Sequence, residues 1–96
     1  MNEFAVTCVA SGNAIVPVDL GVKVTELLYT LKEFGPIGRS ANDGTSYQAT
    51  LVVEATSEEE ARRIAVSAMM MGATSARLPG WPIRASECFV LAPLPS

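Results

Sequence analysis

The sequence predicts a single α+β domain in which two amphipathic helices cover one face of a four-stranded antiparallel sheet. Ninety-six residues allow one domain, with boundaries 1–96. Hydrophobic residues make up 49% of the chain and charged residues 18%, a balance that supports one core. Apolar residues recur with a period of two in some segments and of three to four in others. Along the chain these segments alternate in the order β-α-β-β-α-β.

The first strand and the first helix have clear signals. Phe4–Ala10 alternates in a way that predicts a strand buried on one face and partly covered on the other. Asp19 is placed to cap the helix that follows, and Gly35 with Pro36 is expected to stop it. One apolar stripe runs along this helix: Leu20, Val24, Leu27, Leu28, Leu31 and Phe34.

The middle of the chain predicts a β-hairpin. Ile37–Ala41 is short and is expected to form an edge strand. The Asn-Asp-Gly sequence at 42–44 is a strong turn signal. Tyr47–Ala55 then alternates cleanly, as a half-buried strand does.

The second helix begins with a capping box formed by Ser57 and Glu60, and three consecutive glutamates suit its positive end. We expect it to end between Gly72 and Ala76. A narrow face of small residues would allow close packing: Ala61, Ile64, Ala65, Ala68 and Gly72.

The last strand is predicted over Ile83–Leu91, followed by a proline-containing tail over 92–96. Strict alternation places Glu87 on the same face as the bulkiest residues. Either the bulky face packs against the helices and buries the Glu87 carboxylate, or the bulky face lies on the side of the sheet that the helices leave uncovered. The element order is that of a ferredoxin-like fold, with both crossovers right-handed. Because the first and last strands are then neighbours, we expect Cys8 and Cys88 near each other.

Several kinds of chemistry are excluded. The chain has no histidine, which removes the commonest general base and most zinc sites. Its two cysteines form no disulfide framework, and we expect them to be buried and unreactive. We therefore predict no catalytic residue, no metal site and no cofactor. The open alternative is a histidine-free enzyme that uses Glu54, Glu87 or a cysteine.

Nucleic-acid and membrane partners are not expected. Ten acidic residues against seven basic ones give a net charge of −3, and no basic stripe is present. The chain has no apolar run of the ~20 residues that span a bilayer and no secretory leader, so we expect a cytoplasmic protein. The open-face positions of the two central strands also lack the aromatic residues that stack on RNA bases: Thr7, Val9, Gln48, Thr50 and Val52.

An outer surface of the helices is the first candidate site. Two apolar residues of each helix project away from its buried stripe, and arginines flank the second pair. A contiguous exposed apolar patch often marks a partner site, although scattered surface hydrophobics are also normal. The predicted protein-binding residues are Val22, Tyr29, Arg62, Val66 and Met70.

Two other regions are further candidates. The open face of the sheet carries Val9 and Val52, with Val90 as a third residue, and these would support a homodimer. Trp81 lies between two prolines and near two arginines. Its structural interpretation is a lid over one end of the core, with a cation–π contact.

A resemblance supports the fold prediction. Ser-Glu-Glu-Glu-Ala-Arg-Arg-Ile-Ala at 57–65 and Leu-Pro-Gly-Trp-Pro-Ile-Arg at 78–84 resemble a pattern in small uncharacterised proteins of actinobacteria and their bacteriophages. The resemblance covers about a third of the chain. It implies a single ferredoxin-like domain, assigns no functional residue, and implies a small phage-encoded protein that acts on a host partner.

The function expected from these observations is a non-enzymatic protein-interaction module, such as a phage-encoded modulator of a host protein. Two alternatives stay open at this point. One is a small-ligand-binding regulatory or sensor domain that acts as a homodimer, and the other is the histidine-free enzyme.

Overall fold

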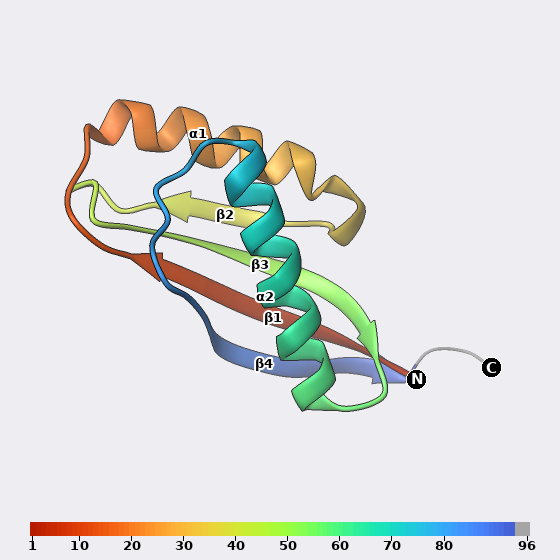
Figure 1. Cartoon of the computed structure of the whole chain (residues 1–96). Helices are drawn as coiled ribbons and strands as arrows, with labels where there is room; N and C mark the ends of the chain where they lie inside the picture. The colour runs from red at the N-terminus through yellow and green to blue at the C-terminus, as the bar shows by residue number, and fades with distance from the viewer. Residues whose placement is uncertain (94–96) are drawn as a thin grey trace.

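The computed structural model describes residues 1–93 and confirms the predicted order of elements. The strands pair in the order β2-β3-β1-β4 as one antiparallel sheet, which is the ferredoxin-like topology. Figure 1 shows α1 and α2 packed against this sheet. The elements are β1 (Asn2–Ser11), α1 (Pro17–Thr30), the 3-10 turn η1 (Lys32–Phe34), β2 (Ile37–Ser40), β3 (Ser46–Ala55), α2 (Glu58–Ser75) and β4 (Ile83–Pro93).

The core lies between the helices and one face of the two central strands. Every second residue of β1 and of β3 points to this side and is buried. The intervening residues of both strands are half-buried or exposed and form the other face of the sheet. The buried strand residues are Phe4, Val6, Cys8, Ala10, Tyr47, Ala49, Leu51, Val53 and Ala55.

The start of α1 differs from the prediction. Pro17 occupies the first turn, and no side chain caps the helix. Proline is well suited to this position because it has no N–H that needs a partner there and its φ is already helical. Asp19, which was expected to be the cap, therefore lies inside the first turn. At the other end α1 stops at Thr30, earlier than predicted, and the chain continues through η1 to Gly35, which adopts the left-handed conformation expected of a stop residue.

The predicted cap of α2 is present, but the Glu60 side chain returns to Thr56 and not to Ser57. The backbone N–H of Glu60 donates to the Ser57 hydroxyl at 3.1 Å, and the Glu60 carboxylate accepts from the backbone of Thr56 at 3.2 Å. The predicted close packing is also found at Gly72, where an added Cβ would meet the side chains of Leu27 and Leu31. Small residues on α2 thus let α1 approach closely.

A β-bulge determines which residues of β4 face the helices, the question that strict alternation could not answer. Ala85 pairs with Cys8 and Glu87 pairs with Thr7, so Ser86 is an extra residue. Its hydroxyl donates to the backbone carbonyl of Thr7 at 3.2 Å. The extra residue shifts the alternation of β4, so Ala85 and Cys88 both face the helices while Glu87 faces away from them.

The end of β4 also differs from the prediction. Ala92 and Pro93 were expected in a tail, but they pair with Glu3 and Asn2 and belong to the strand. A second register shift in β4 falls opposite the step from Glu3 to Phe4. The rest of the predicted tail, 94–96, lies outside the described residues. No helix within residues 1–93 is both long enough and apolar enough to cross a membrane.

Candidate functional site

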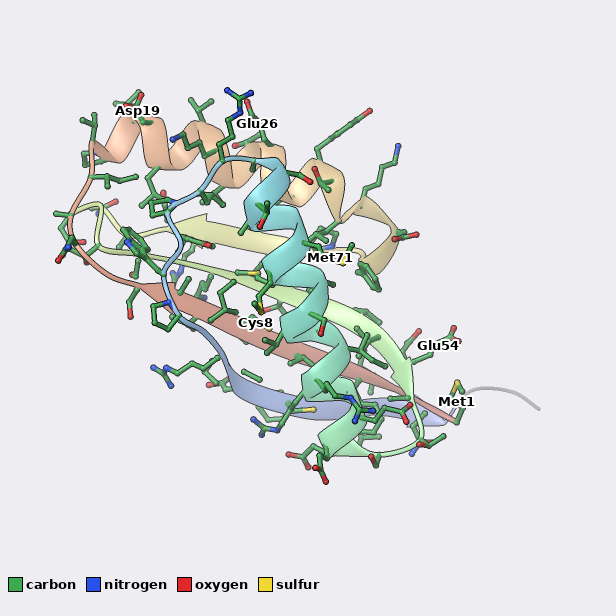
Figure 2. The ribbon with its side chains drawn as sticks, in the orientation of Figure 1. Met1, Cys8, Asp19, Glu26, Glu54 and Met71 are labelled. Carbon is green, nitrogen blue, oxygen red and sulfur yellow. The ribbon has the colours of Figure 1, made fainter. Side chains whose placement is uncertain are left out.

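The predicted residues of α1 lie on the outer side of the helix layer. Val22 and Tyr29 are both exposed. Val22 lines a groove between α1 and the end of α2, together with Asp19 and Glu26, which point away from the sheet in Figure 2. The ring of Tyr29 lies 5.0 Å from the Lys32 ammonium, a cation–π distance.

The predicted residues of α2 lie in a different place. Met70 is exposed and borders a groove formed with Pro79 and Trp81. Val66 is half-buried and packs against the core. The Arg62 guanidinium is used within the chain, because it donates to the Ala85 carbonyl at 3.0 Å and pairs with Glu58 at 3.0 Å.

The five predicted residues therefore lie in two groups. On α1, Val22 lines the groove toward the end of α2. Arg62 and Met70 lie on the flank of α2 that faces β4 and the segment before it. The separation follows from how the helices cover the sheet. α1 packs on β2 and β3, while α2 packs across β1, β3 and β4.

The two thiols of the chain both have raised pKa values. Burial, together with the nearby Cys88, raises the pKa of Cys8 to about 11. Burial also raises the pKa of Cys88, with a further contribution from Glu58. Both thiols are free and stay protonated near neutral pH. Figure 2 shows Cys8 on the core side of the sheet, beside α2.

The carboxylates considered as an acid pair are not paired with each other. Glu54 lies opposite Glu3, and Glu87 lies opposite Thr7, so they occupy different positions along the sheet. Within residues 1–93 no three His, Cys, Asp or Glu side chains gather in a group that could hold a metal ion.

Trp81 is half-buried and packs against the core, as its interpretation as a lid predicts. Its ring stacks on the ring of Tyr47. The cation–π contact expected at Trp81 is not found in the described part of the chain, where Lys32 and Tyr29 make that kind of contact instead.

The sheet surface opposite the helices, called the open face below, is not covered by any element of residues 1–93. Its residues fall into four rows across the strands because the strands pair in a fixed register. Val9 and Val52 lie on this face as expected. Val90 does not, because it pairs with Phe4 and takes the helix side of β4 after the bulge.

The rows of the open face differ in charge and in apolar content. At one end is an acidic row. Next comes an apolar row, then a mixed row, and at the other end a basic row. The acidic row is Glu3 and Glu54, the apolar row is Ala5, Val52 and Phe89, the mixed row is Thr7, Ile37, Thr50 and Glu87, and the basic row is Val9, Arg39, Gln48 and Arg84.

Two residues at the edges of these rows are exposed and apolar. Phe89 on β4 is 60% exposed, and Ile37 on β2 is 78% exposed. In the middle, Thr7 and Thr50 join across the strands through their hydroxyls at 2.8 Å. Sequence reasoning placed Val9 and Val52 on this face, left the face of Phe89 undecided and missed Ile37, because a row can be recognised only after the strand register is known.

The comparisons with known proteins do not extend the assignment beyond the fold class. No protein-family model matches the chain, and no curated protein matches it. The topology itself defines a single ferredoxin-like α+β unit.

Proposed function

We propose that this chain is a non-enzymatic interaction module that binds a protein partner through the open face. The observation that carries the proposal is the layout of that face. An apolar row and a mixed row, which includes Glu87, lie between an acidic end and a basic end, and no element within residues 1–93 covers them.

The physical basis is desolvation combined with orientation. Covering exposed apolar side chains such as Phe89 and Ile37 is favourable, and aromatic residues are enriched in protein interfaces. Charged rows at the two ends add complementarity, which sets the orientation of a partner more than its affinity.

The helix surface offers a weaker case. The Arg62 guanidinium is already bound to Ala85 and Glu58, and Val66 is half-buried. Val22 and Met70 border separate grooves. A partner on the helices would have to contact two separated groups of residues, whereas the open face is continuous.

The resemblance to small actinobacterial and phage proteins adds one class of partner. A host protein that binds a phage-encoded module would bind the same open face under this proposal. The acidic and basic rows would then have to match charges of opposite sign on that protein.

Photo-crosslinking in the source cells tests the proposal with a matched pair of sites. A benzophenone amino acid replaces Phe89 on the open face in one variant and Tyr29 on the helix layer in the other. Both positions carry exposed aromatic rings, 60% and 72% respectively. We expect a discrete protein adduct from position 89 and none from position 29. An adduct from position 29 alone, or from neither position, would contradict the proposal.

A further inference from the structure

We infer that the partner of the open face is a second copy of this chain, seated face to face with its strands running in the opposite direction. The inference rests on the proposed function of the open face. It specifies both the occupant and its orientation.

The acidic row leaves a like-charge pair at one end of the face. Glu3 and Glu54 lie directly opposite each other on β1 and β3. Like charges placed opposite each other in a sheet are destabilising. A cationic group placed over this pair would relieve the repulsion.

The same face carries the complementary charge at its other end. Arg39 on β2 and Arg84 on β4 lie in one row. Arg39 pairs with Gln48, Gln48 pairs with Val9, and Val9 pairs with Arg84. The acidic and basic rows are separated along the strands by roughly 20 Å, from the standard rise per strand residue. The face is therefore self-complementary if it is turned end for end.

Two-fold symmetry provides that turn. An axis that lies in the interface and runs across the strands places the acidic row of one copy over the basic row of the other, twice in each dimer. It also brings the apolar row over the mixed row. Because the axis keeps β4 over β4, Phe89 of one copy then lies over Glu87 of the other. An axis parallel to the strands would instead place acidic on acidic and basic on basic.

The area of the open face determines the dimer affinity that we expect. Standard strand spacing gives a face of roughly 20 by 25 Å. Covering two such faces buries on the order of 1,000 Å², close to the lower limit for a specific interface. We therefore expect a dimer with a Kd in the micromolar range, seen when the purified chain is followed by sedimentation velocity over a wide concentration range.

Two charge variants test the orientation. One is the double variant Arg39→Glu with Arg84→Glu, whose open face becomes acidic at both ends. The other is Glu3→Lys with Glu54→Lys, whose open face becomes basic at both ends. Each alone should dimerise at least about tenfold more weakly than the unchanged chain, since like-charge juxtaposition opposes association.

Mixing the two variants is the decisive step. Turned end for end, an acidic-faced copy and a basic-faced copy meet with opposite charges at both ends. We expect the mixture to form a heterodimer at least as tight as the native dimer. Native mass spectrometry distinguishes it from both homodimers. A chain that carries all four substitutions should dimerise like the unchanged chain.

Matched controls lie on the helix layer. Glu59→Lys and Arg63→Glu change exposed charges of α2 and should leave the dimer affinity unchanged. Circular dichroism and thermal unfolding confirm that each variant keeps its fold.

Two results would overturn the inference. A purified chain that stays monomeric at millimolar concentration excludes the second copy as the occupant. If crosslinking from position 89 then captures a different protein, the proposed function stands and only this inference fails. A dimer that is indifferent to both charge variants, with no heterodimer on mixing, excludes the end-for-end arrangement.

Discussion

The ring of Trp81 stacks on the buried ring of Tyr47, with 6.0 Å between the ring centroids and 29° between their planes. The contact joins the segment after α2 to the start of β3. Gly12 leaves room for it, because an added Cβ there would meet the indole ring. The Tyr47 hydroxyl beneath is buried and finds no hydrogen-bond partner among the described residues.

The Tyr47 hydroxyl gives the first prediction. A buried hydroxyl without a partner costs about 1–3 kcal/mol, so Tyr47→Phe should leave the free energy of unfolding unchanged or raise it by about 1 kcal/mol. The ring stack on Trp81 is kept. Urea unfolding measures the change, and a clear loss of stability would mean that the hydroxyl is satisfied in solution.

The close contact between Gly12 and Trp81 gives the second prediction. Gly12→Ala should destabilise the fold by about 1–3 kcal/mol, because the new methyl group overlaps the Trp81 ring. Trp81→Ala removes that ring. In the double variant, the added cost of the Gly12 change should therefore largely disappear. Additive costs in this double-mutant cycle would show that the two positions are not in contact.

The β-bulge at Ser86 in β4 gives the third prediction. Deleting Ser86 brings Ala85 and Glu87 into ordinary succession opposite Cys8 and Thr7, so every remaining residue keeps its face. We expect the shortened chain to fold, with a loss of about 1 kcal/mol from the missing hydrogen bond to Thr7. Chemical denaturation measures the loss.

Deleting Cys88 is the matched control for that experiment. It forces either a charge or Phe89 onto the helix side, so it should cost several times more than the Ser86 deletion. Equal costs for the two deletions would contradict the bulge assignment.

The buried thiol of Cys8 gives the fourth prediction. Its pKa is raised from 9.0 to about 11 in the folded chain, mainly by burial. The folded state therefore holds this proton more tightly than the unfolded state. The resulting stability is fully present below about pH 9 and is lost as the pH rises to about 11, an effect on the order of 2–3 kcal/mol.

Comparison with Cys8→Ala isolates this effect. Tyr47 and Cys88 also have raised pKa values, and they titrate in both chains. The stability advantage of the native chain over the variant should therefore shrink between about pH 9 and about pH 11. A constant difference across that range would contradict the raised pKa. In the native chain, a thiol reagent near neutral pH should label Cys88 before Cys8.

The sequence predicted the features that local patterns control. The element order follows from the two periodicities, and the cap of α2 at Ser57 and Glu60 is a short-range signal. Gly72 was recognised as part of a close-packing face because the small residues of α2 recur at helical spacing. The start of α1 was missed because proline at the first turn replaced the side-chain cap expected from Asp19.

The candidate site could be predicted only in part, since it depends on contacts between distant segments. The bulge at Ser86 is visible only in the pairing of β4 with β1, and it moves Val90 to the helix side. Without the strand register, the sequence does not show that Arg39 and Arg84 lie in the same row of the open face. The separation of Val22 from Met70 depends on which strands each helix covers, which helical periodicity does not determine.

The two register shifts in β4 have a further consequence. β4 lies at the end of the strand order, so no strand of residues 1–93 pairs with its outer edge. A long straight edge recruits strands from other molecules, whereas bulges twist an edge and disrupt its hydrogen-bonding pattern. The shifts at Ser86 and near Glu3 therefore make the outer edge of β4 a poor template for strands added from other molecules.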